Sequence, residues 1–127
     1  MVKPIVKSIV KSLAILNSKA PYGSSAGKDA LDIALVFGSF EQPVSLFFQG
    51  DGVWQLVQGQ NGAMVSVKDY LKTFAAFEFY DIEEIYVCQA SLIERNLADT
   101  FHIEAVQVLG SEAFAAQLTS HHTILRF

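Results

Sequence analysis

The sequence predicts a single-domain, three-layer α/β/α fold in which helices cover both faces of a mostly parallel, five-stranded sheet. Short apolar runs alternate along the chain with segments whose apolar residues recur at helical spacing. Parallel strands need long crossover connections, usually helices, so this alternation favours a parallel sheet. The length of 127 residues fits one domain. Hydrophobic residues make up 51% of the chain and charged residues 17%, which is enough apolar mass for a core.

Two strands and one helix are expected before residue 50. Residues 13–17 form an apolar run that ends in a polar turn cluster, as a buried parallel strand does where it leaves the sheet. From Ser25 or Gly27, apolar residues recur at helical spacing until a break at 41–43, which predicts a helix. The β-rich run 44–49 stops at a pair of glycines and is predicted to be the second strand.

Three further helices and three further strands complete the expected plan. After a loop at 58–62, helices are predicted at 69–77, 91–97 and 111–120, and strands at 85–88, 104–109 and 123–127. The predicted domain therefore covers residues 12–127. Residues 1–11 are left as an unassigned N-terminal arm, because its lysines interrupt β-branched residues that form no tight apolar stripe.

The composition argues against several kinds of ligand and cellular compartment. Nine Lys and Arg against thirteen Asp and Glu give a formal net charge of -4, which does not favour direct nucleic-acid binding. A single cysteine excludes an internal disulfide and a zinc site built from paired cysteines, and it favours a reducing cytoplasm. No apolar stretch approaches the roughly 18 residues of a membrane span, and no export signal is evident. A soluble, cytoplasmic protein with no membrane partner is therefore expected.

Three motifs resemble functional sites without meeting their requirements. Residues 23–29 look like a phosphate loop, but too few residues separate the glycines, and Asp29 replaces the Ser or Thr that binds Mg²⁺. His102 and Glu104 form only half of a zinc-deaminase motif, because no Pro-Cys-x-x-Cys follows. His121 and His122 are adjacent, so on a strand they would face opposite sides. No metal site and no cofactor is predicted.

Cys88 is the residue with the clearest chemical potential. At the carboxyl end of a parallel strand it would lie where open α/β sheets place their sites, and a helix that begins after it would direct amide groups toward it. That position favours a thiolate. The alternative interpretation is a buried thiol that packs as a small hydrophobe. The sequence places no activating His or Arg next to Cys88, and Arg95 lies seven positions further along the chain. Cys88 is thus a candidate persulfide residue, and no residue is assigned as catalytic.

The chain is also rich in aromatic residues. It contains ten Phe, four Tyr and one Trp, with a cluster over 74–80. This load exceeds what one sheet face needs and favours an apolar surface that meets a partner, with an aromatic-rich core as the alternative.

Several segments occur in an order that points to a family. The most specific are APYGSSAG at 20–27, LFFQGDGVWQL at 46–56 and VCQASL at 87–92, supported by DYLKTF at 69–74 and ILRF at 124–127. Together they resemble the TusC-type, or DsrF-like, subunits of the DsrE/DsrF/DsrH family of intracellular sulfur-relay proteins. The resemblance covers about residues 12–127 and implies a DsrE-like fold, which looks similar to flavodoxin.

The resemblance implies a subunit of the TusBCD complex, in which three related subunits form a dimer of heterotrimers. TusB-like and TusD-like chains would be its partners in a heterohexamer. Persulfide sulfur would pass from a TusA-like to a TusE-like protein, for 2-thiolation of the wobble uridine of tRNA. In the family the sulfur-carrying cysteine lies on the TusD-type subunit, so the resemblance favours a non-catalytic role for this chain and weakens that of Cys88.

Three other functions stay open at this point. A DsrF-like subunit in sulfur-oxidation metabolism would look similar in sequence. A sulfurtransferase that carries persulfide on Cys88 is the second alternative. A flavodoxin-like module that binds a nucleotide or a flavin is the third, and the incomplete phosphate loop weakens it.

Overall fold

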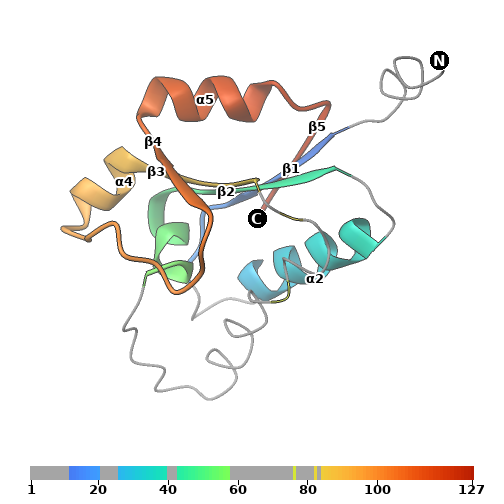
Figure 1. Ribbon diagram of the computed structural model, residues 1–127, viewed down its shortest axis with the longest axis horizontal. Helices are drawn as coiled ribbons and strands as arrows, with labels where there is room; N and C mark the ends of the chain where they lie inside the picture. Colours follow the sequence, from blue (N-terminus) through green and yellow to red (C-terminus); the bar gives the residue numbers. More distant parts are fainter. Residues whose placement is uncertain (1–11, 21–25, 40–42, 58–75, 77–81, 83) are drawn as a thin grey trace.

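The computed structural model describes residues 12–20, 26–39, 43–57, 76, 82 and 84–127, and these form an α/β structure in three layers (Figure 1). One sheet of five parallel strands has the order β4-β3-β2-β1-β5. Helix α2 (Ala26–Ser39) lies on one face of the sheet and α5 (Ser111–Thr119) on the other. The predicted fold class is confirmed. The strands are β1 (Leu13–Asn17), β2 (Val44–Phe48), β3 (Glu84–Cys88), β4 (Val106–Leu109) and β5 (Thr123–Arg126).

The strands begin and end close to their predicted positions, and the largest difference has a local cause. Strand β4 begins at Val106 and not at Glu104, because Ala105 has a φ of 67° and this left-handed conformation cannot continue a strand. The helix predicted at 91–97 lies earlier, as α4 (Gln89–Glu94), since Cys88 itself is its N-cap residue. A 3₁₀ helix, η1 (Gly50–Gln55), follows β2 where only a glycine turn was expected.

Four predictions fall outside the described residues. They are the arm at 1–11, the loop at 58–62, the helix at 69–77 except for residue 76, and most of the aromatic cluster at 74–80.

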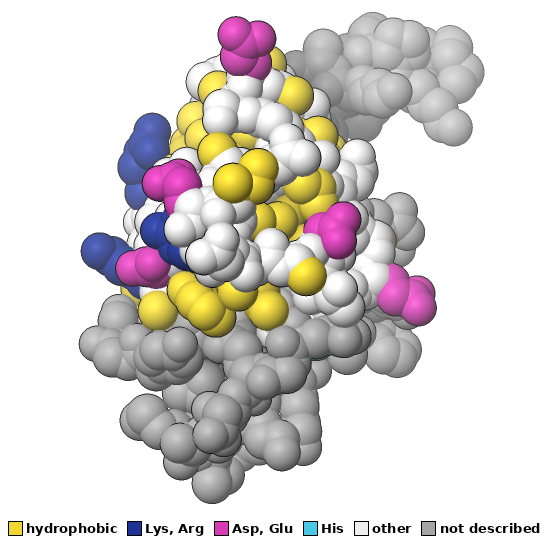
Figure 2. Space-filling view, turned by 90° about the vertical axis from the view of Figure 1, so that its left-hand side faces the viewer, with side chains coloured by type: hydrophobic (Ala, Val, Ile, Leu, Met, Phe, Trp, Pro, Cys, Tyr) yellow, Lys and Arg dark blue, Asp and Glu magenta, His cyan; other side chains and the backbone are white. Residues whose placement is uncertain are grey.

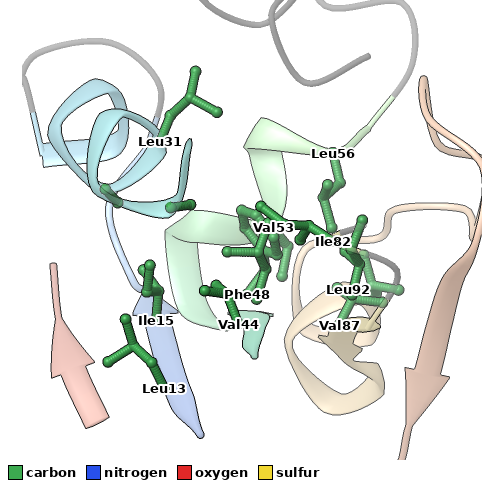
Figure 3. Close-up of a cluster of buried hydrophobic side chains, with 14 residues drawn as sticks. Leu13, Ile15, Leu31, Val44, Phe48, Val53, Leu56, Ile82, Val87 and Leu92 are labelled. Atoms are coloured by element: carbon green, nitrogen blue, oxygen red, sulfur yellow. The ribbon is translucent and has the colours of Figure 1, made fainter. Parts of the chain in front are cut away.

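The side chains of the sheet alternate between two apolar clusters, one on each face. On β1, Leu13 and Ile15 point toward the α2 face, while Ala14 and Leu16 point toward the α5 face. The cluster on the α2 face is the larger, and Figure 3 shows it extending from Leu13 to Leu92 across several elements. Each large side chain that is fully buried in this way contributes roughly 1.5–3 kcal/mol of hydrophobic free energy.

The buried face of helix α2 consists mostly of small residues. Its buried residues are Gly27, Ala30, Leu31, Ala34 and Gly38, which recur at helical spacing. Its outward face carries an ion pair between Lys28 and Asp32, one turn apart, at 3.0 Å. None of the helices in the described part of the chain has both the length and the apolar character needed to cross a membrane.

The strand order reverses between β1 and β5, and the backbone of Phe127 extends the pairing of these two strands by one residue. Strand β1 leads to α2 on one face and β5 follows α5 on the other, so their carboxyl ends form the topological switch of the sheet. The Phe127 N–H donates to the Leu16 carbonyl at 2.9 Å, and the Phe127 carbonyl accepts from the Ser18 N–H at 3.0 Å.

Candidate functional site: the carboxyl edge around Cys88

Cys88 lies at the carboxyl edge of the sheet, as the sequence predicts. It is the last residue of β3 and pairs with Leu109 on β4. On the other side Val87 pairs with Phe48, so the turn that begins at Gln49 leaves β2 next to Cys88. The helix α4 begins at the residue that follows Cys88.

The thiol of Cys88 is buried among apolar side chains. The residue is only 8% exposed and belongs to the cluster on the α5 face, with Leu16, Phe47 and Phe114. Among the residues that the structure describes, none hydrogen-bonds to the thiol. Its surroundings are those of a small hydrophobe, which is the second of the two interpretations of Cys88.

Arg95 is tied to its own neighbours instead of facing the thiol. Its Nε donates to Oδ1 of Asp51 on η1 at 3.1 Å, and one terminal nitrogen donates to the Ser91 carbonyl at 3.1 Å. The Asp51 side chain is 62% exposed, so this pair contributes no more than about 0.2–1 kcal/mol. Its effect is geometric, because it joins η1 to the end of α4.

Ser91 makes a second link between the same two elements. The Gly50 N–H donates to Oγ of Ser91 at 2.9 Å, and Ser91 is 6% exposed. Gly50 has a φ of 53°, which places the turn in the left-handed region that glycine favours. The turn after β2 and the helix after β3 are therefore joined by Ser91 and Arg95, which lie one helical turn apart.

Sequence reasoning did not single out Ser91 or Asp51. The available signal is the spacing of Ser91 and Arg95, which places both on one face of a helix after β3. That face meets the Gly50–Asp51 turn only because β2 and β3 are parallel neighbours. Strand order was unknown from the sequence, so the pairing was unknown too.

Buried amides hold the end of β1 against β2 and η1. Asn17 is 3% exposed, and its Nδ2 donates to the carbonyls of Ile15 and Phe47 at 3.4 and 3.3 Å. The buried Gln55 donates from Nε2 to the Lys19 carbonyl at 2.9 Å. These bonds fix the frame on which the carboxyl edge is built.

The three histidines bind backbone and serine groups, and they do not converge. His102 Nε2 lies 2.6 Å from the Gln55 carbonyl. His121 and His122 lie in the bend before β5 and not on a strand. His121 bonds through Nε2 to Ser45 Oγ at 2.8 Å, whereas Nδ1 of His122 lies 3.3 Å from Ser12 Oγ. Within the described residues, no group of three or more His, Cys, Asp and Glu side chains could hold a metal ion.

The rejected phosphate loop is described only at its end. Residues 23–25 lie outside the described residues, and α2 begins at Ala26. Asp29 is exposed in the first turn of α2. A carboxylate at the N-terminus of a helix stabilises the helix through its dipole, and it repels a phosphate group.

The surface at this end of the molecule carries charges of both signs. Figure 2 views the side on which α4 lies in Figure 1, and it shows Lys and Arg, Asp and Glu, and hydrophobic side chains mixed together. On this face the described residues form no large basic field of the kind that nucleic acids require.

Comparison with known proteins identifies the family. Residues 11–127 match the DsrE/DsrF-like family. The structure is similar to the crystal structure of the ychN protein from E. coli, with a TM-score of 0.74 and 21% sequence identity, over 92% of this chain and 99% of that chain. At this identity the likeness supports the fold. Because the family match spans nearly the whole sequence, the chain belongs to the DsrE/DsrF-like family, which is involved in sulfur relay.

Proposed function

We propose that this chain is a non-carrier subunit of a TusBCD-type complex, which relays persulfide sulfur for 2-thiolation of tRNA wobble uridine in the cytoplasm. Family membership and the TusC-like segments at 20–27, 46–56 and 87–92 support the proposal. The observation that carries it is the burial of Cys88: the residue lies at the carboxyl edge of the sheet but is only 8% exposed and has apolar neighbours.

The chemistry of sulfur relay explains why this burial matters. In each transfer an acceptor thiolate attacks the outer sulfur of a persulfide, a new S–S bond forms, the old S–S bond breaks, and the donor leaves as a thiolate. The attacking sulfur must reach its target in line, and a thiol packed beneath α5 offers no such approach. A subunit of this kind contributes by enclosing a persulfide on a sister chain and shielding it from water and reductants.

The second candidate function is that Cys88 carries the persulfide, and the position of Cys88 in the fold favours this role. Cys88 is the last residue of β3 and lies next to the turn that follows β2. This carboxyl edge of the sheet is where α/β proteins place their active sites. The two candidates differ in one consequence, because a carrier needs the sulfur atom itself and a packed thiol does not.

The nucleotide or flavin module has less support. The segment that resembles a phosphate loop has too few residues between its glycines, and the carboxylate of Asp29 would repel a phosphate group. A DsrF-like role in sulfur oxidation stays an alternative, because such a subunit would look similar in sequence.

The proposal is tested by deleting the gene and measuring 2-thiouridine in total tRNA by nucleoside mass spectrometry. Loss of 2-thiouridine, restored by a plasmid copy, is expected. Normal 2-thiouridine together with a defect in sulfur oxidation would contradict the tRNA role and favour the DsrF-like alternative.

A further inference from the structure

Polar groups from three adjacent strands meet at the carboxyl edge of the sheet. Ser18 follows β1, Gly50 follows β2, and Arg95 follows the helix that leaves β3. These strands are parallel neighbours, so their carboxyl ends lie at one edge, where α/β sheets place their ligands. A Cβ atom built on Gly50 would lie 3.8 Å from the carbonyl oxygen of Ser18 and 3.9 Å from Nη2 of Arg95. The three residues therefore adjoin one small space.

Gly50 keeps this space open. Its φ of 53° is a conformation that residues with a side chain rarely adopt, and glycine leaves no atom at the Cβ position. Among the described residues, the Ser18 oxygen and Arg95 Nη2 are the atoms that come within 4 Å of that position, apart from Gly50 and its chain neighbours. A space that would accept a methyl group in ordinary van der Waals contact thus adjoins one hydrogen-bond acceptor and one donor.

Both groups have hydrogen-bonding capacity to spare. The Arg95 guanidinium is held by Nε, which donates to Asp51, and by Nη1, which donates to the Ser91 carbonyl. In the described part of the chain, no acceptor bonds to Nη2 and no donor bonds to the Ser18 carbonyl oxygen. Arg95 therefore presents a fixed, charged N–H donor at the edge of the sheet.

The dimensions of this space select the atom that can bind both groups. An oxygen or nitrogen at the Cβ position would lie too far from either group, since hydrogen bonds between these elements are about 2.7–3.2 Å long. A sulfur atom is larger and more polarisable, and it hydrogen-bonds over longer distances. A sulfur that carries one hydrogen can accept from Nη2 of Arg95 and donate its hydrogen to the Ser18 carbonyl. The space therefore fits an S–H group.

We propose that the space beside Gly50 binds a terminal S–H sulfur, either free hydrosulfide or the outer sulfur of a hydropersulfide. Arg95 Nη2 donates to the sulfur, and the sulfur donates to the Ser18 carbonyl. The site binds sulfur without covalent chemistry, so no bond forms or breaks there. A role for this site in the cell rests on the proposed relay function, in which it would hold the outer sulfur of a sister chain's persulfide.

The site is tested by titrating the full-length chain with sodium hydrosulfide and recording amide NMR signals of glycine isotopically labelled at nitrogen. The Gly50 signal, identified by its loss in Gly50→Ala, reports on the space, and chloride at equal ionic strength is the control anion. The solutions are free of oxygen and mildly alkaline, so that most of the sulfide is hydrosulfide. Hydrosulfide should shift the Gly50 signal saturably, and chloride should not.

A second titration distinguishes the two sources of sulfur. It compares glutathione hydropersulfide, which ends in an S–H group, with S-methylglutathione, which has none. A saturable shift by hydrosulfide or by the hydropersulfide supports the site and shows which of them it accepts. A site that responds to neither, or that responds equally to chloride or S-methylglutathione, would overturn the proposal.

Arg95→Gln and Arg126→Gln form a matched pair of variants. Both remove one arginine charge near the carboxyl edge of the sheet, but Arg126 is exposed at the end of β5. Arg95→Gln should weaken hydrosulfide binding about 10-fold, as expected for the loss of one hydrogen bond from a charged donor. Arg126→Gln should change it by less than about 2-fold, because salt screens exposed charges at a distance. Equal effects of the two substitutions would contradict the assigned role of Arg95.

Gly50→Ala keeps the test decisive if Arg95→Gln fails to fold. Its methyl group would occupy the proposed site, so hydrosulfide binding, read from the amide signal of Gly52 in the same 3₁₀ helix, should be lost. Gly110→Ala is the control, because a Cβ at position 110 meets nothing within 4 Å. Binding that survives in Gly50→Ala would rule out this site. That result would leave the relay function standing, whereas normal 2-thiouridine in the deletion strain would contradict the relay function alone.

Discussion

Gly52 packs directly against the carbonyl group of Asn17, at the point where η1 crosses the end of β1. A Cβ atom at position 52 would collide with the carbonyl oxygen and carbon of Asn17. The Gln49 N–H already donates to that oxygen at 3.0 Å, so the Asn17 carbonyl cannot move aside without losing this bond. The close approach of η1 to β1 therefore requires glycine.

We expect Gly52→Ala to destabilise the domain by about 2–3 kcal/mol, because backbone and not a flexible side chain meets the added methyl group. Gly110→Ala is the control. A Cβ at position 110 meets nothing within 4 Å, so its effect should stay within about 1 kcal/mol. Urea unfolding measures both, and equal midpoints would contradict this account of η1.

The end of α5 should be energetically coupled to β2 through His121 and Ser45. The His121 ring lies edge-on to Phe47, with centroids 5.4 Å apart, and bonds to Gln117 and Ser45 at 2.9 and 2.8 Å. A double-mutant cycle of His121→Ala and Ser45→Ala should give a coupling free energy of about 0.5–1.5 kcal/mol. Additive effects in urea unfolding would show that the bond contributes nothing in solution.

Tyr86 should make the protein lose stability in alkali. Burial, followed by the hydrogen bond and negative charge of Glu84, raises the pKa of Tyr86 to about 12 from its usual value of 10.0. Since the folded form holds this proton more tightly, the stabilisation is complete below pH 10 and is lost as the pH rises from 10 toward 12.

Tyr86→Phe tests this effect, because phenylalanine has no proton to lose. The free energy of unfolding should fall less steeply in the variant than in the wild type between pH 10 and 12. Identical slopes of stability against pH would contradict the raised pKa of Tyr86.

Partner chains should reduce the self-association of the purified protein. The aromatic load and the exposed Ile93, Val36 and Phe37 side chains favour association. Expressed alone, the chain should self-associate, and coexpression with TusB-like and TusD-like chains should give a discrete hetero-oligomer by light scattering. A stable monomer whose solubility is unchanged by those chains would count against the proposed complex.

The sequence predicts the strands better than the site, for physical reasons. Residues 13–17 and 44–48 are buried throughout and mostly apolar, so these short runs carry a direct signal. The order of the strands has no such signal, because it depends on long-range pairing. For this reason the position of Cys88 on the carboxyl edge was predictable, and its neighbours were not.

Two local features also escaped prediction. Helix η1 depends on the contact between Gly52 and Asn17, which lie far apart in sequence. The early start of α4 depends on Cys88 serving as the N-cap with no side-chain cap hydrogen bond, and sequence rules look for Ser, Thr, Asp or Asn at this place.

The most direct test of the central claim is the level of 2-thiouridine in a deletion strain that carries Cys88→Ser in place of the wild-type gene. If the chain is a non-carrier subunit, the substitution costs about 1 kcal/mol of stability and leaves both the complex and tRNA thiolation intact. Nucleoside mass spectrometry should then show wild-type 2-thiouridine, and gel filtration of the complex should show the wild-type elution volume. Loss of 2-thiouridine with an unchanged elution volume would contradict the account and make Cys88 a sulfur carrier.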